Sequence, residues 1–301
     1  MEWTIVAGDQ RAVVTEVGGG LRCFAVNGTD FIDGYRSEEL RPGGAGQVMA
    51  PWPNRLRDGK YSFAGIPRQL PLNEPERANA IHGLVNWVAW RPIEVAEDTV
   101  AIEYELPPQP GYPFSLRLRT RWSVGSDGLR AEHEASNLGT EPAPFGLGTH
   151  PYLRIPGAVV DDLELRMSMG SHLLSDNRLL PIGAARVNGG PYDFSDGRRL
   201  GGVHLDTAFG LPHRDSSGMI RAVLTAPDGR AVTLWADSSF HWLQVYTSDG
   251  LSGDRERRAV AVEPMTCPPD ALRSGRDLVI LEPGETWRGA WGITAGDTLE
   301  R

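Results

Sequence analysis

Glycine and proline interrupt this chain so evenly that long helices are hard to accommodate. The 301 residues include 36 glycines and 23 prolines, scattered along the whole sequence. Between them, short segments alternate apolar and polar residues, which is the period of a half-buried strand rather than of a helix. No window gives a convincing amphipathic helix longer than about three turns. Strands at a spacing of about 8–12 residues indicate an all-β sandwich or barrel.

The clearest alternation runs through residues 116–122 and is followed by the turn sequence Gly125-Ser126-Asp127-Gly128. The return segment then places Leu129, Ala131, His133 and Ala135 on one face, as expected for the second strand of a hairpin. We predict further strands by the same pattern over residues 11–17, 61–66, 100–106, 219–226, 231–236, 242–247 and 286–294.

The length of the chain permits two domains, but all-β folds of this size are often single. No serine- or glycine-rich linker, charge block, composition shift or internal repeat divides the sequence, so we predict one domain over residues 1–301. The glycine- and proline-rich run 41–53 is too long for a hairpin turn. We expect it to cross the fold irregularly near a functional pocket.

Charge and composition exclude several classes of function. A net charge of −9 and a pI near 5.3 argue against broad binding to nucleic acid or to anionic membranes. Two cysteines, Cys23 and Cys267, do not make a disulfide framework. The N-terminus lacks the pattern of a signal peptide, and no apolar stretch has transmembrane length. We expect a cytoplasmic monomer or homodimer, with no nucleic-acid or membrane partner.

One histidine and one glutamate are the strongest candidates for chemistry. His150 is approached through residues 144–149, which contain two glycines, and Pro151 fixes the exit. So much backbone control around one imidazole favours a functional role. Glu263 follows the apolar run 259–262, which reads as a buried strand, so its carboxylate is either ion-paired or kept for chemistry. Together they could act as an acid and a base on one substrate.

Several polar residues are candidates for binding. Asn54 and Arg55 follow Pro51-Trp52-Pro53, which stiffens the backbone that orients them. An arginine fork and an asparagine amide suit vicinal hydroxyls or a ring oxygen, although a surface turn with a salt-bridged arginine gives the same pattern. A structural role is equally open for the weaker candidates, which are His82 (before Gly83), Asp206, and Gln244 on a strand face with Trp242 and Tyr246.

Other familiar chemistries have no signature in the sequence. There is no phosphate loop, dinucleotide-binding glycine motif, zinc-protease motif or nucleophile elbow. The histidines are too dispersed to suggest zinc by their spacing, and His133 should face away from Glu132 and Glu134. We therefore expect neither a metal nor a cofactor. We interpret the mixed-charge run 254–258 as a solvated loop and Cys267 as a packing residue.

The candidate segments, in this order, resemble the aldose 1-epimerase (mutarotase) family across roughly residues 13–293. Asn54-Arg55 with the following Gly59–Gly65 segment is similar to the family's first motif, and Ile81-His82-Gly83 to its first histidine motif. Thr149-His150-Pro151-Tyr152 resembles the motif that holds the family's general acid. The remaining similarities are Leu205-Asp206-Thr207 to the substrate-binding aspartate segment, residues 243–247 to a Gln-x-Tyr-Thr strand, and Val262-Glu263 to the position of the base.

The resemblance implies a large antiparallel β-sandwich of the galactose mutarotase type, with a sugar cleft and no cofactor. It also implies interconversion of the α and β anomers of a free hexopyranose. Glu263 would take the proton of the C1 hydroxyl while protonated His150 donates to the ring oxygen. The His150 pKa should therefore lie near or above neutrality, and the pKa of Glu263 need only remain low enough for it to ionise. The expected supporting residues are Arg55 and His82 at the ring-oxygen side, Asp206 and Gln244 at the hydroxyls, Asn54 behind Arg55, and Trp52 against the sugar ring.

The choice of sugar and three rival functions remain open at this point. Pro51-Trp52-Pro53 and residues 264–271 differ from galactose-type members and look more like a bacterial subgroup, some of whose members act on sulfonated glucose. Glucose, galactose and a C6-anionic hexose such as sulfoquinovose are therefore all candidates, with Arg57 available for an anionic group. The rivals are a non-catalytic carbohydrate-binding protein, a sensor that has lost turnover, and a glycoside hydrolase using Asp206 and Glu263.

Overall fold

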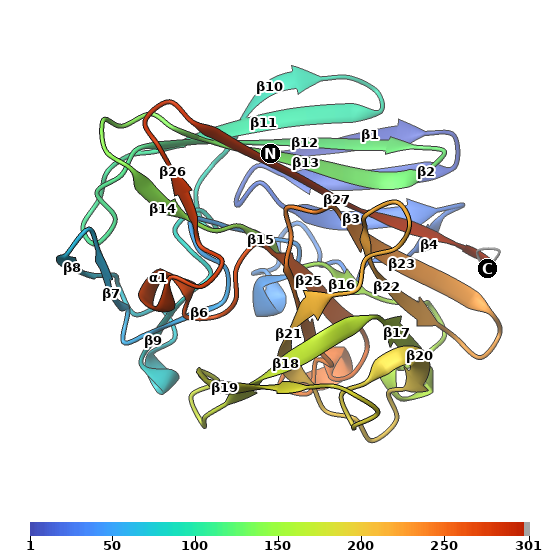
Figure 1. Ribbon diagram of the computed structural model, residues 1–301. Helices are drawn as coiled ribbons and strands as arrows, with labels where there is room; N and C mark the ends of the chain where they lie inside the picture. Colours follow the sequence, from blue (N-terminus) through green and yellow to red (C-terminus); the bar gives the residue numbers. More distant parts are fainter. Residues whose placement is uncertain (298–301) are drawn as a thin grey trace.

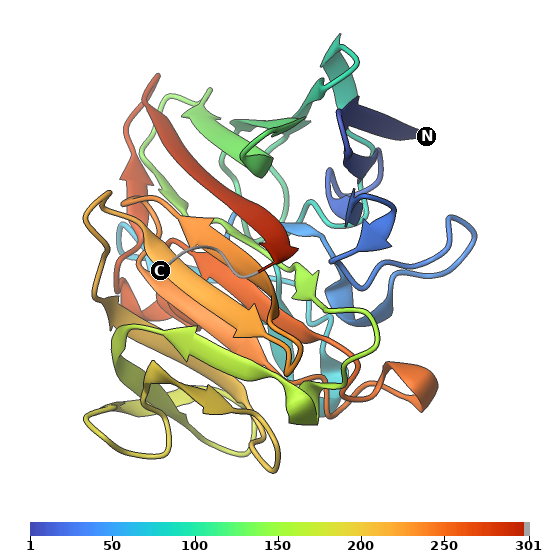
Figure 2. The ribbon, with the colours of Figure 1, turned by 90° about the vertical axis from the view of Figure 1, so that its right-hand side faces the viewer.

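The computed structural model describes residues 1–297 and is built from antiparallel strands with very little helix (Figure 1). Its largest sheet has nine strands in the order β10-β11-β12-β13-β27-β23-β22-β17-β20. Figure 2 shows the C-terminal strand β27 in red, alongside β23 and β22 in orange. The strands of this sheet are β10 (Arg91–Val95), β11 (Thr99–Leu106), β12 (Leu116–Gly125), β13 (Gly128–Asn137), β17 (Glu164–Met167), β20 (Phe194–Arg199), β22 (Ile220–Thr225), β23 (Arg230–Ala236) and β27 (Thr286–Asp297).

A second sheet of eight strands carries Asp206, Gln244 and Glu263, and His150 directly follows one of its strands. Its order is β19-β18-β21-β24-β25-β15-β5, and β16 pairs with β25 beside this path. Its strands are β5 (Val48–Met49), β15 (Gly148–Thr149), β16 (Tyr152–Leu153), β18 (Met169–Ser175), β19 (Pro181–Arg186), β21 (Asp206–Pro212), β24 (Trp242–Tyr246) and β25 (Val260–Met265).

The remaining elements are short and surround these two sheets. One four-stranded sheet consists of β1 (Glu2–Ala7), β2 (Gln10–Thr15), β3 (Leu21–Val26) and β4 (Thr29–Asp30), and packs against β11–β13. Three ladders pair β6 (Arg55–Arg57) with β9 (Asn79–Ile81), β7 (Lys60–Phe63) with β8 (Ile66–Gln69), and β14 (Ala143–Phe145) with β26 (Val279–Leu281). The helical turns are η1 (Pro42–Gly44), η2 (Pro75–Arg77), η3 (Val160–Asp162), η4 (Gly253–Arg255) and α1 (Ala271–Ser274). Within residues 1–297, no helix has the length and apolar character to cross a bilayer.

The sequence prediction of an all-β fold is confirmed, and the hairpin β12–β13 shows why the pattern was informative. Along β12, every second residue from Leu116 onward is buried against the core, because successive side chains of a strand point to opposite faces. His133 on β13 shares the buried face, whereas Glu132 and Glu134 do not. Trp122 and Trp291 meet edge to face in this core, with ring centroids 5.8 Å apart.

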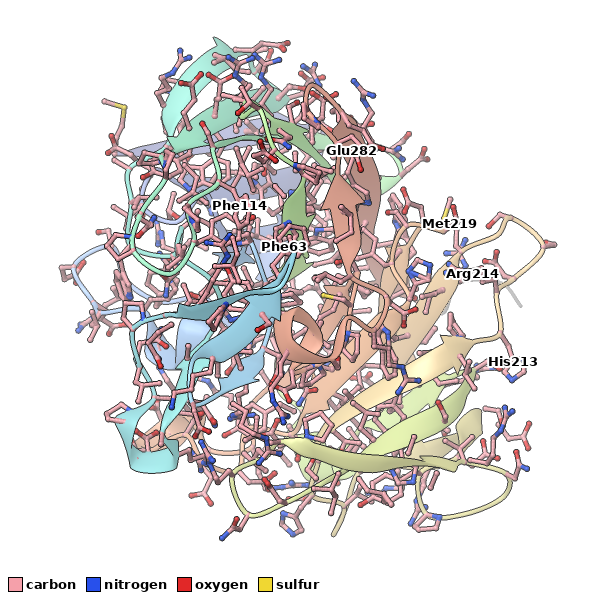
Figure 3. All side chains as sticks on the ribbon, turned by 60° about the vertical axis from the view of Figure 1, so that its left-hand side comes forward. Phe63, Phe114, His213, Arg214, Met219 and Glu282 are labelled. Carbon is pink, nitrogen blue, oxygen red and sulfur yellow. The ribbon has the colours of Figure 1, made fainter. Side chains whose placement is uncertain are left out.

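Two segment predictions were wrong in detail. Residues 61–66 are not one strand, because Ala64 and Gly65 both adopt positive φ and form the turn between β7 and β8. Phe63, at the end of β7, packs edge to face on Phe114, with ring centroids 5.5 Å apart (Figure 3). The run 254–258 is not simply solvated, because Arg255 and Arg258 both bind the buried carboxylate of Asp33.

Candidate functional site

A cavity of about 480 Å³ brings together six of the seven predicted site residues. His150, Glu263, Asn54, Arg55, His82 and Asp206 all line it. The run 41–53 contributes to its wall, as predicted. A hollow of the same volume beside Lys60 and Arg273 holds no comparable acid–base pair. The lining is completed by Arg41, Gly43, Gly44, Gln47, Asn73, Arg77, Ile81, Asn86, Trp87, Tyr152, Tyr246, Gly250 and Leu251.

The backbone on either side of the cavity fixes the two candidate catalytic residues. His150 follows β15; its N–H donates to the carbonyl of Gln47 at 3.2 Å, and its own carbonyl accepts from Gly46 at 2.8 Å. Glu263 lies inside β25, opposite Gln244 of β24. The prediction that Glu263 ends its strand was therefore wrong, since β25 continues to Met265. Nε2 of His150 lies 3.3 Å from Oε1 of Glu263.

Burial sets the protonation of this pair, and it acts opposite to the sequence-based expectation. Desolvation, offset in part by a backbone hydrogen bond and reinforced by the charge of Arg55, lowers the pKa of His150 to about 3. Desolvation, and then the charge of Asp206, raise the pKa of Glu263 well above its usual range, while Arg55 works against that rise. The prediction that the pKa of His150 lies near or above neutrality was wrong. Removing the charged imidazolium from water costs more free energy than the interaction with the facing carboxyl provides.

Both members of the pair keep unused hydrogen-bonding capacity. Nδ1 of His150 and Oε2 of Glu263 are buried, and neither has a hydrogen-bond partner among residues 1–297. The His150 ring stacks on Tyr152, with centroids 4.9 Å apart, and His82 approaches it edge-on at 5.4 Å. Sequence reasoning did not single out Tyr152, although it closes the motif Thr149–Tyr152. Buried polar atoms without partners are rare in folded proteins, and both atoms belong to side chains that line a cavity able to hold a polar ligand.

Arg55 and Asp206 form an ion pair at the cavity wall, and Gln244 stands behind it. Nη1 of Arg55 lies 3.6 Å from Oδ2 of Asp206, and Nε2 of Gln244 donates to Oδ1 of Asp206 at 2.5 Å. Gln244 is not among the residues that line the cavity, and its contact with sugar hydroxyls stays a prediction. The side of Arg55 away from the cavity is bound by Glu74. Both interpretations of Arg55 therefore apply, because it is salt-bridged and also lines the cavity.

Asn54 connects Arg55 to His82. The backbone of Asn54 is left-handed, with φ 57°, a conformation that asparagine tolerates better than most residues. Its Oδ1 accepts from the N–H of Arg55 at 2.7 Å, which supports the predicted buttressing role, and its own N–H donates to Nδ1 of His82 at 3.2 Å. Burial lowers the pKa of His82 well below its usual value. A neutral His82 whose Nδ1 accepts must carry its proton on Nε2.

Besides Tyr152, sequence reasoning missed Arg41 and Trp87 at the cavity wall, and it misplaced Trp52. Arg41 is only 9% exposed, and its Nε and Nη1 have no hydrogen-bond partner in the described part of the chain. Its guanidinium lies 5.2 Å from the ring centroid of Trp87. Trp52 is buried in the core rather than at the cavity. Arg57 also lies outside the cavity lining and pairs with Asp176 and Asp270.

Comparison with known proteins relates the chain to one family. The sequence model of the aldose 1-epimerase family matches residues 1–294. The chain is 32% identical over 286 residues to the protein YihR of Escherichia coli (strain K12), covering 95% of this chain and 90% of that protein.

Solved structures show the same fold at lower identity. An aldose epimerase homologue from C. elegans superposes with a TM-score of 0.88 at 18% identity, covering 99% of both chains. Galactose 1-epimerase from Lactobacillus acidophilus NCFM superposes with a TM-score of 0.81 at 22% identity, covering 97% of this chain and 94% of that one. The predicted β-sandwich of the galactose mutarotase type is confirmed by these likenesses.

Proposed function

The chain belongs to the aldose 1-epimerase family, and from this premise we propose that it interconverts the α and β anomers of a free hexopyranose. It opens and recloses the sugar ring by acid–base catalysis, without a metal or cofactor. We further propose that residues 1–301 act as one domain in the cytoplasm.

The observation that carries this proposal is the contact of His150 with Glu263 on the wall of a single cavity. Ring opening of a hemiacetal requires a proton to leave the C1 hydroxyl and another to reach the ring oxygen. Both oxygens are bonded to the same carbon, so the acid and the base must stand next to each other rather than at opposite ends of the sugar. Two adjacent groups, one that donates a proton while the other accepts one, meet that requirement.

The pair holds one exchangeable proton in either of two arrangements. Burial favours the neutral arrangement, with the proton on Glu263. A C1 hydroxyl that donates to the Glu263 carboxyl stabilises its charged form, because hydrogen bonds to a charged form favour it. His150 then carries the proton of the pair and donates it to the ring oxygen as the C1–O5 bond breaks, while Glu263 takes the proton of the C1 hydroxyl. The aldehyde end rotates about C1–C2, and the ring closes on the other face with the two roles reversed.

The surrounding groups suit orientation and charge stabilisation. Arg55 and the Nε2–H of His82 present donors toward the same cavity, where they would stabilise negative charge that develops on the ring oxygen. Asp206 accepts hydrogen bonds from sugar hydroxyls while Gln244 holds its orientation. Trp87, which is 58% exposed at the rim, replaces Trp52 as the candidate surface for stacking on a sugar ring.

Arg41 supports an anionic hexose over a neutral one. An arginine this buried normally faces a carboxylate, because an uncompensated charge is expensive away from water. Arg41 has instead one hydrogen bond, to the carbonyl of Val17 at 2.8 Å, and the face of Trp87. We propose that its free N–H groups bind an anionic substituent of the sugar, and C6-charged hexoses are the direct test.

Exchange NMR tests the function without a coupled assay. The rate of α-to-β interconversion is measured for glucose, galactose and their C6-charged relatives, with and without the protein. Exchange faster than in buffer alone is expected for at least one sugar, with the charged sugars favoured. No acceleration for any of them would overturn the proposal in favour of a binding protein or sensor. Release of reducing sugar from a glycoside would favour a hydrolase, in which Asp206 and Glu263 would be the two carboxylates.

A further inference from the structure

Arg55 is bound by the carboxylate of Glu74, which does not line the cavity. Glu74 precedes η2 and is buried, and both of its oxygens accept from Nε of Arg55 at 3.1 Å. Arg55 lines the cavity and Glu74 does not. Any effect of Glu74 on a bound sugar must therefore pass through Arg55 or through Arg77, which also lines the cavity and whose Nη1 donates to Oε1 of Glu74 at 3.2 Å.

Glu74 is itself held rigidly. The fully buried side chain of Asn79 donates from Nδ2 to Oε2 of Glu74 at 2.8 Å. The backbones of Glu74 and Asn79 also exchange two hydrogen bonds, each 3.1 Å long. Arg178 then donates to Oδ1 of Asn79 at 3.2 Å. A carboxylate fixed by this many partners offers Arg55 a single place to bind.

The ion pair between Glu74 and Arg55 has a geometric and an electrostatic consequence. Because Glu74 occupies Nε of Arg55, the Nη groups are left to face Asp206 and the cavity, which is the use of a rigid planar fork. The negative charge of Glu74 also offsets part of the Arg55 charge that acts on His150 and Glu263. Neither consequence requires Glu74 to contact the sugar.

We propose that Glu74 is a positioning residue of the site, which orients the Arg55 guanidinium and moderates its field at the His150–Glu263 pair. The consequence for catalysis rests on the function proposed above. The charged and titratable groups that line the cavity with the pair are Arg41, Arg55, Arg77, His82, Tyr152, Asp206 and Tyr246. Glu74 binds two of these, Arg55 and the more exposed Arg77, and only Arg55 is bound through both carboxylate oxygens.

Glu74→Gln tests the electrostatic part, because it removes the charge and nearly preserves the shape. Arg55 lowers the pKa of both His150 and Glu263, so an uncompensated Arg55 should lower both further. Both limbs of the pH profile of kcat/KM should move to lower pH, and kcat/KM at neutral pH should fall about tenfold or more. Glu74→Asp keeps the charge on a shorter side chain, so it should lose activity while its limbs stay at the wild-type positions.

Glu103→Gln is the matched control. Glu103 is also buried and bound by arginines, among them Arg119 at 2.5 Å, but on β11 of the nine-stranded sheet. This variant should keep both pH limbs and the activity per folded molecule, with the folded fraction measured by thermal unfolding. The proposal is overturned if Glu74→Gln keeps the wild-type limbs and loses no more activity than Glu103→Gln, or if Glu74→Asp retains full activity.

A direct titration separates this proposal from the proposed function. The carboxyl carbon of Glu263 is followed by carbon-13 NMR in the wild-type protein and in Glu74→Gln. A lower midpoint in the variant supports the coupling, and an unchanged midpoint contradicts it, whether or not any sugar turns over. A wild-type protein that accelerates no exchange would instead refute the function alone. If Glu74→Gln does not fold, the activity and the pH profile of Glu74→Asp still test whether Glu74 orients the Arg55 guanidinium.

Discussion

Two buried histidines in this molecule have the same lowered pKa and opposite surroundings. Desolvation brings the pKa of both His133 and His150 to about 3. In the nine-stranded sheet, His133 uses both ring nitrogens, one with Oγ1 of Thr120 and one with Nε1 of Trp291, each at 2.9 Å. His150 faces the carboxyl of Glu263 and leaves Nδ1 without a partner within residues 1–297. A shifted pKa is common to core and site, whereas unused hydrogen-bonding capacity beside a carboxyl distinguishes the site.

The partners explain why only one of these rings can exchange a proton. The Trp291 indole can only donate, so Nε2 of His133 must accept, and its Nδ1–H must donate to Thr120. Protonating His133 would set two N–H groups against each other in the core. His150 faces an oxygen that can either donate or accept, so a proton can sit on either side. The same burial therefore fixes one histidine and leaves the other ready for proton transfer.

The largest expected effect comes from removing the proton-transfer group. His150→Asn should reduce kcat/KM for anomer exchange by about 10²–10⁴-fold, the usual contribution of a positioned general acid or base. Glu263→Gln should cost at least as much, because neither residue suffices alone. Exchange NMR measures the loss, and thermal unfolding shows that the variants remain folded. Activity near that of the wild type in either variant would contradict the catalytic assignment.

The core histidine should respond in the opposite way. His133→Leu leaves the hydroxyl of Thr120 and the indole N–H of Trp291 buried without their partner, which costs about 1–3 kcal/mol in the free energy of unfolding. Exchange activity per folded molecule should stay at the wild-type level. Urea unfolding and exchange NMR on the same samples check both statements. A loss of activity beyond the loss of folded protein would remove the distinction between the two histidines.

The sequence predicted those features that depend on local pattern. Alternation over residues 116–122 was enough to predict the β12–β13 hairpin and the buried face of His133, because a strand repeats every two residues. Motif order was enough to select His150 and Glu263. Burial across several strands was not visible in this way, so the pKa of His150 was predicted wrongly.

Features that depend on long-range pairing could not be read from the chain. Gln244 lies behind Asp206 because β24 pairs with β21 in a register that neighbouring residues do not reveal. Arg41 looked like any arginine in a glycine- and proline-rich run, and only the fold shows that no carboxylate in the described chain pairs with it. Trp52 and Arg57 lie within three residues of the cavity-lining Asn54, yet their side chains are directed elsewhere.

The dependence of stability on pH should also separate the two histidines, with a smaller effect. Between the unfolded pKa of 6.5 and about 3, the unfolded chain binds a proton at His133 and another at His150 that the folded chain does not. Each therefore makes the protein less stable as pH falls, by up to about 1.4 kcal/mol per pH unit. Glu263 acts in the opposite direction above its unfolded pKa of 4.5, because the folded carboxyl keeps its proton.

Between pH 4.5 and 6.5 the two site groups should therefore act in opposite directions, so that the slope comes mainly from the other buried histidines, which are His133 and, in wild type and variants alike, His82. We expect His133→Leu to flatten the plot of unfolding free energy against pH in this window. The double variant His150→Asn, Glu263→Gln should keep the wild-type slope. His241, whose pKa is also lowered by burial, contributes equally to all three proteins. Urea unfolding across the window measures the slopes, and flattening in the double variant alone would contradict this account.

The smallest expected effects are those of substituting two arginines, Arg41 and Arg57. They extend the comparison of a site residue with a structural residue from histidines to arginines. Arg57 has its carboxylate partners, Asp176 and Asp270, and lies outside the cavity lining. Arg41 lines the cavity with two nitrogens unpartnered in the described chain. Arg41→Gln should raise KM for C6-charged hexoses by about tenfold, the equivalent of one lost charge-assisted hydrogen bond, and should change KM for neutral hexoses much less. Arg57→Gln should alter neither by more than about twofold, as is usual for substitutions away from a site. Equal effects of the two variants on the charged sugars would show that unused hydrogen-bonding capacity is not what marks a binding group in this protein.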